Sequence, residues 1–93
     1  MFFVWFDGDR KRQPHLKLKD ALAEYQAKYG IVPLVCLTSA ADAAAIGEKG
    51  SAFDFRIQPV PFVAVNTFYL GGQDAQAALS QLDLPAVELR EAA

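Results

Sequence analysis

The side chains best suited to chemistry are Asp7 and Asp9, which follow an apolar run over residues 2–6. A strand that is apolar on both faces is typical of the interior of a sheet. Ligands bind at the carboxyl ends of such strands, and one or two carboxylates can hold Mg²⁺ together with phosphate and water. Thr38 ends a second apolar run and is expected at the same edge. The alternative is an ordinary polar turn, for which Asp-Gly is common and which we favour.

Two resemblances follow from these residues. An apolar strand followed by Asp-x-Asp resembles the first motif of haloacid-dehalogenase-like phosphatases, and Thr38 resembles their second. This resemblance implies a Mg²⁺-dependent phosphoester hydrolase that uses Asp7, Asp9 and Thr38, with Asp7 and Asp9 as the metal ligands. Arg10 and Lys11 stand where that family has other residues. In outline the first part of the chain also resembles small CRISPR-associated nucleases, although the net charge of -2 argues against a nucleic-acid partner.

The remaining basic, histidine and cysteine side chains do not indicate a catalytic or binding site. The basic residues within 10–19 are typical of a solvated helix face, and no aromatic residue separates them as base stacking would require. His15 is the only histidine and Cys36 the only cysteine. The sequence therefore predicts no nucleophilic triad, zinc site, disulfide or cofactor. Cys36 is expected to be a buried, inert strand residue.

Length and composition indicate one domain spanning residues 1–93. The chain is 53% hydrophobic, so a domain of this size is expected to have a dense core. The run over 2–6 is too short for a signal peptide. Prolines and glycines interrupt the uncharged stretch over 57–73, which argues against a membrane helix. We therefore expect a cytoplasmic protein with no membrane partner.

Apolar spacing predicts the elements that position these residues. Pro14 can begin a helix whose apolar residues recur three and four apart, and Gly30 can end it. With apolar strands on either side, residues 2–37 are expected to form a βαβ unit. Ser39 and Asp42 can cap a short helix over 40–46.

The second half of the chain predicts further strands. Phe53, Phe55 and Ile57 alternate with polar residues, as in a strand with one solvated face. The run 62–70 predicts a strand or strand pair. A last helical face follows in Ala75, Ala78, Leu79 and Leu82. We therefore expect an α/β fold with a mixed sheet of about four or five strands, an N-terminal βαβ unit and a C-terminal hairpin plus helix.

Two further resemblances concern larger parts of the chain. Val60-Pro61, an apolar run and Gly71-Gly72 resemble the end of a glutaredoxin, in which a cis Val-Pro bond precedes a strand hairpin. The resemblance implies a thioredoxin-like topology, but no cysteine follows the first strand, so it implies a redox-inactive protein. Through Val4–Asp7 and Phe68–Gly71 the chain also resembles a group of small bacterial α/β proteins without assigned function. That resemblance implies no activity, ligand or partner.

The apolar run 62–70 also predicts an interface, because both of its strand faces are apolar. The residues expected to form it are Phe62, Val63, Val65, Phe68 and Tyr69. We therefore expect a non-catalytic interaction protein that self-associates as a homodimer, with an unidentified protein partner as a further possibility. The alternatives are the Mg²⁺-dependent hydrolase or nuclease and the redox-inactive thioredoxin-like protein.

Overall fold

The computed structural model describes residues 2–73, which form a mixed four-stranded sheet and two α-helices. In chain order the elements are β1 (Phe2–Phe6), α1 (Pro14–Tyr29), β2 (Val35–Thr38), α2 (Ala40–Ile46), the 3₁₀ segment η1 (Gly47–Ala52), β3 (Arg56–Pro59) and β4 (Thr67–Gly71). The predicted α/β class, mixed sheet and N-terminal strand–helix–strand unit are confirmed. The helix expected over 75–82 lies outside the described residues.

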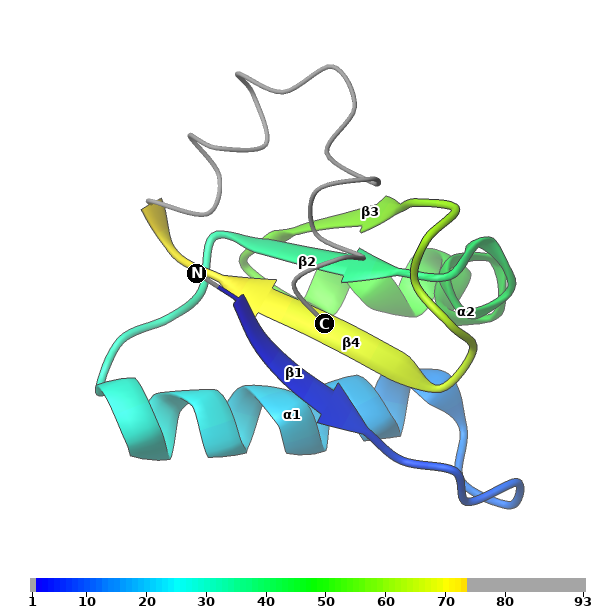
Figure 1. Cartoon of the computed structure of the whole chain (residues 1–93), viewed down its shortest axis with the longest axis horizontal. Helices are drawn as coiled ribbons and strands as arrows, with labels where there is room; N and C mark the ends of the chain where they lie inside the picture. Colours follow the sequence, from blue (N-terminus) through cyan, green and yellow to red (C-terminus); the bar gives the residue numbers. More distant parts are fainter. Residues whose placement is uncertain (1, 74–93) are drawn as a thin grey trace.

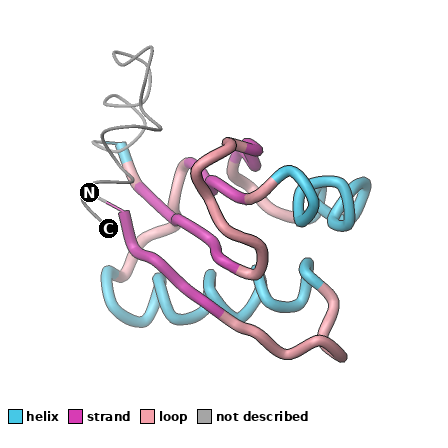
Figure 2. Tube along the Cα trace, turned by 45° about the vertical axis from the view of Figure 1, so that its right-hand side comes forward, coloured by secondary structure: helices cyan, strands magenta, loops and turns pink. Residues whose placement is uncertain are grey.

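The strands are arranged in the order β1-β4-β2-β3, so β4 separates β1 from β2 (Figure 1). β4 is antiparallel to both of its neighbours, whereas β2 and β3 are parallel. β1, β2 and β3 therefore end at the same edge of the sheet. In place of a hairpin over 62–70, one long loop leads from β3 back to the single strand β4 (Figure 2). Pro59 and Pro61 supply no amide donors, which prevents continuous strand pairing here.

Helix bounds follow from local signals. Pro14 takes the first position of α1, and Gly30 ends the helix at a φ of 72°, with its N–H donating to the Gln26 carbonyl at 2.8 Å. Glycine adopts this left-handed conformation without steric penalty. In α2 the Ser39 side chain accepts the Asp42 N–H, so the predicted cap is confirmed.

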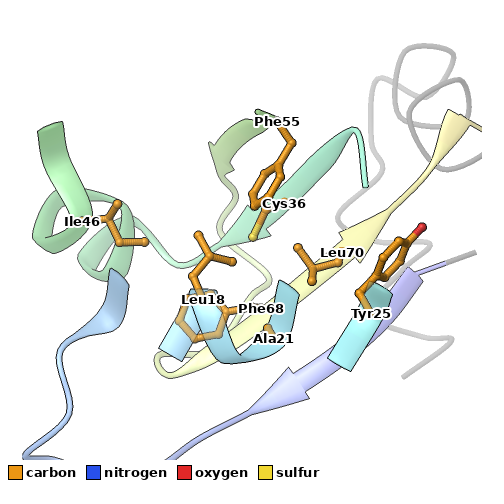
Figure 3. Close-up of a cluster of buried hydrophobic side chains, with 8 residues drawn as sticks. All are labelled: Leu18, Ala21, Tyr25, Cys36, Ile46, Phe55, Phe68 and Leu70. Atoms are coloured by element: carbon orange, nitrogen blue, oxygen red, sulfur yellow. The ribbon is translucent and has the colours of Figure 1, made fainter. Parts of the chain in front are cut away.

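The main core lies between one face of the sheet and the two helices. Its buried members are Leu18, Ala21, Tyr25, Cys36, Ile46, Phe55, Phe68 and Leu70 (Figure 3). A second cluster on the opposite face contains Val35, Leu37, Val60, Val63 and Tyr69. The loop after β3 contributes Val60 and Val63, so this loop covers part of that face.

β2 and β3 are shorter than the strands that the sequence pattern predicted. Ile31, Val32 and Leu34 are exposed, and β2 begins only at Val35. β3 begins at Arg56, so the alternating residues Phe53 and Phe55 precede it. Residues 2–73 contain no cis peptide bond, so the Val60–Pro61 bond is trans, unlike the cis bond that the glutaredoxin resemblance implied.

Candidate functional site

Asp7 and Asp9 lie in the turn after β1, at the edge where the parallel strands end. Asp7 Oδ1 accepts the Asp9 N–H at 2.9 Å, and Asp9 Oδ1 accepts the Lys11 N–H at 2.9 Å. Each carboxylate therefore stabilises its own turn, as Asp commonly does. Thr38 is fully buried, and its hydroxyl donates to the Ser39 carbonyl at 3.0 Å. Within residues 2–73, no three His, Cys, Asp or Glu side chains gather as potential metal ligands.

A buried polar network that the sequence analysis missed lies at the same edge. Lys17 of α1 is only 2% exposed, and its Nζ donates to Asn66 Oδ1 at 2.8 Å. The backbone N–H of Asn66 donates to Asp42 Oδ2 at 2.7 Å. Ser39 Oγ donates to the same Asp42 oxygen at 3.0 Å. We call these four residues the Asn66 network.

The backbone of Asn66 explains why one residue can join these groups. Its φ is 70°, and no other non-glycine residue among 2–73 has a positive φ. Asparagine tolerates this left-handed conformation better than most residues. The Asn66 carbonyl also accepts the Asp7 N–H at 3.0 Å. Asn66 thus links the turn after β1, the first turns of α1 and α2, and the start of β4.

The Asn66 network is built as a structural clamp. The buried charges of Lys17 and Asp42 are joined through Asn66 rather than by a direct ion pair. A buried charge of either sign is stable only when its surroundings compensate it. These polar atoms bond to one another, so the arrangement favours a role in holding α1, α2 and β4 together.

A pocket of about 270 Å³ lies elsewhere, between α2, η1 and β3. Its lining residues are Ala43, Ile46, Gly47, Gly50, Phe55 and Ile57. None of these side chains titrates or can act as a nucleophile. The pocket therefore lacks the acid, base and nucleophile side chains that an enzyme site requires.

The predicted interface residues fall into different environments. Phe68 is 0% exposed, and Val63 and Tyr69 are also buried. For these three residues the expected exposed surface is wrong, because β4 is an interior strand and the loop after β3 packs on the sheet. Phe62 is half-buried, and Val65 is 53% exposed.

Exposed apolar side chains occur instead on β1, an edge strand of the sheet. Val4 is 50% exposed and Phe6 is 68% exposed. Val4 lies opposite Tyr69 in the β1–β4 register, so both side chains lie on the sheet face away from the main core. The Phe6 ring lies over Gly8, where an added Cβ would come 3.1 Å from Phe6 Cζ. We call residues 2–6, with these exposed side chains, the β1 edge.

Cys36 lies in β2 and is fully buried. Burial raises the pKa of its thiol well above the ordinary range, because desolvation disfavours the thiolate. Since the thiolate is the reactive form, the position of Cys36 supports no redox role.

Native Cys36 is therefore expected to react with a chromogenic disulfide reagent at neutral pH roughly 100-fold more slowly than in the unfolded protein, because reaction requires local opening. The rate is measured from reagent absorbance, with the protein in denaturant as the control. Native labelling at the rate of the unfolded protein would contradict this expectation.

Comparison with known proteins finds no family model, no curated protein and no solved structure that matches the chain. Among residues 2–73, no helix has the length and apolar character needed to cross a membrane.

Proposed function

We propose that this protein is a small, non-catalytic binding domain that associates with a second copy of itself. The observation that supports the proposal is the β1 edge, which lies at the margin of the sheet, carries no charged residue and exposes Val4 and Phe6. Natural proteins usually protect such an edge with charges, proline or a covering partner. A cytoplasmic location and the absence of a nucleic-acid partner belong to the same proposal. The single cysteine, which cannot form an intramolecular disulfide, supports the first, and the net charge of -2 supports the second.

The exposed side chains favour weak association. Full burial of a Val or Phe side chain contributes about 1.5–3 kcal/mol, and Val4 and Phe6 are already partly covered. A micromolar complex requires about 8 kcal/mol after the loss of translational freedom. The two side chains alone therefore supply less than this, and we expect other groups of the edge to contribute.

Equilibrium sedimentation tests self-association directly. We expect the protein to be largely dimeric at about 100 µM. Phe6→Lys is expected to shift it to monomer, because a buried ammonium without a partner is unfavourable. Ile31→Lys is the matched control, since Ile31 is 57% exposed but lies in the loop before β2. A wild type that stays monomeric at all concentrations up to about 100 µM would refute the proposal.

The alternative functions have less support from the geometry. Asp7 and Asp9 each use a carboxylate oxygen to stabilise their own turn, and the Thr38 hydroxyl is buried against a carbonyl. A Mg²⁺-dependent hydrolase would need these groups turned toward a substrate. A redox function would need an accessible thiolate, which the burial of Cys36 disfavours.

A further inference from the structure

Within residues 2–73, the outer side of β1 presents backbone groups that have no hydrogen-bond partner. The Asp7 N–H donates to the Asn66 carbonyl, which continues the β1–β4 register. Bonded and non-bonded pairs alternate along antiparallel strands, so Phe3 and Trp5 also direct their N–H and C=O groups toward β4. The backbone groups of Phe2, Val4 and Phe6 consequently point away from β4. No turn, loop or side-chain hydrogen bond within residues 2–73 satisfies them.

The opposite edge of the sheet is protected. The Arg56 N–H donates to the carbonyl of Leu34, directly before β2, and the Val60 N–H donates to the carbonyl of Thr38 in β2. The backbone N–H and C=O groups of alternate β3 residues therefore point away from β2, and these residues are Ile57 and Pro59. Pro59 has no N–H to offer an incoming strand, and the neighbouring Arg56 is exposed and charged. β1 contains neither proline nor charge.

Resting on the proposed function, we propose that β1 pairs antiparallel with β1 of a second copy, about a two-fold axis at Val4. Phe2 of each copy then lies opposite Phe6 of the other, and the two sheets join into one. The strand is self-complementary in this register, because every facing pair is apolar and no like charges meet. The outward N–H and C=O groups of Phe2, Val4 and Phe6 are satisfied in both copies.

Interface area and closure both favour a second copy as the occupant of this edge. A fully covered aromatic side chain buries about 150–250 Å², so Val4 and Phe6 alone fall far below the roughly 800 Å² per partner of a standard interface. Pairing along the whole strand adds its outer backbone and the flanks of Phe3 and Trp5. A two-fold contact is also closed by its symmetry, and among the described strands it leaves the protected β3 edge free on each copy.

Cysteine cross-linking at Val4 tests the register. The Val4 pair would be hydrogen-bonded, with Cα atoms about 5.5 Å apart, which is within the range that a disulfide spans. Under mild oxidation with oxidised glutathione, Val4→Cys is expected to form covalent dimer at least about tenfold faster than Ile31→Cys, because association raises the effective thiol concentration. Ile31 is the control because it is similarly exposed. Equal rates for the two variants would overturn the register.

A second variant tests edge pairing without cysteine chemistry. Val4→Pro removes an N–H that points away from β4, so the variant is expected to keep the circular dichroism spectrum of the wild type and to sediment as a monomer. A folded Val4→Pro dimer would overturn the edge pairing. If the wild type is a dimer but neither the Val4→Cys nor the Val4→Pro variant behaves as expected, self-association holds and the β1 edge is refuted as its surface. A monomeric wild type would refute both proposals.

Discussion

Asp42→Ala is expected to lower the free energy of unfolding by about 3–5 kcal/mol, because the carboxylate accepts two hydrogen bonds and each hydrogen bond to a charged group contributes about 1.5–3 kcal/mol. Asp42 is 3% exposed, and its Oδ2 accepts from both Ser39 Oγ and the Asn66 N–H. Removal leaves these donors unsatisfied and releases Asn66, which binds the buried Lys17 ammonium, from its contact with α2. Urea unfolding followed by circular dichroism measures the loss.

Asp54→Ala is the matched control, because Asp54 is exposed and its loss is expected to change stability by no more than about 0.5 kcal/mol. Asn66→Gly separates the contact with Lys17 from the backbone conformation, since glycine adopts a φ of 70° without strain. It is expected to destabilise less than Asn66→Ala, which loses the amide and also strains the turn. An Asp42→Ala protein as stable as Asp54→Ala would contradict the clamp assigned to the Asn66 network.

Phe68→Ala is also expected to cost about 3–5 kcal/mol, as large-to-small changes at buried aromatic positions do. Phe68 is 0% exposed in the interior strand β4 and packs in the main core (Figure 3). The deletion removes apolar contacts and leaves a cavity that the surrounding side chains fill only in part. The same urea unfolding experiment measures this loss.

Phe6→Ala provides the comparison at a second phenylalanine. Phe6 is 68% exposed, so its truncation is expected to change the unfolding free energy of the isolated monomer by no more than about 0.5 kcal/mol while weakening self-association. Measurements at low micromolar protein keep the monomer in excess. Equal destabilisation by Phe6→Ala and Phe68→Ala would show that β4 is not the interior strand.

The bounds of both helices could be predicted because their causes are local. Pro14 and Gly30 mark the ends of α1, and Ser39 with Asp42 marks the start of α2. Each signal acts over a few residues through one backbone group or one side-chain hydrogen bond. Burial of Cys36 was likewise predictable, because it lies within an apolar run between charged and polar segments.

The Asn66 network could not be predicted, although its start at Ser39 and Asp42 was visible as a helix cap. Asn66 lies 49 positions from Lys17 and 24 positions from Asp42 along the chain. No local pattern brings residues so far apart together, and an asparagine before a strand is equally typical of an ordinary turn. Asn66 reaches its place between Lys17 and Asp42 only because the chain returns to the sheet as β4.

Strand order was the other feature that local patterns left open. The runs 2–6 and 62–70 are both apolar on both faces, and the sequence predicted an interior strand for the first and an interface for the second. In the folded chain β4 pairs on both sides and buries Phe68, while β1 is left at the edge with Val4 and Phe6 exposed. Composition and periodicity thus specify which segments become helices and strands. The pairing of distant strands depends on the packing of the whole sheet, and this pairing determines which apolar strand is interior and which lies at the edge.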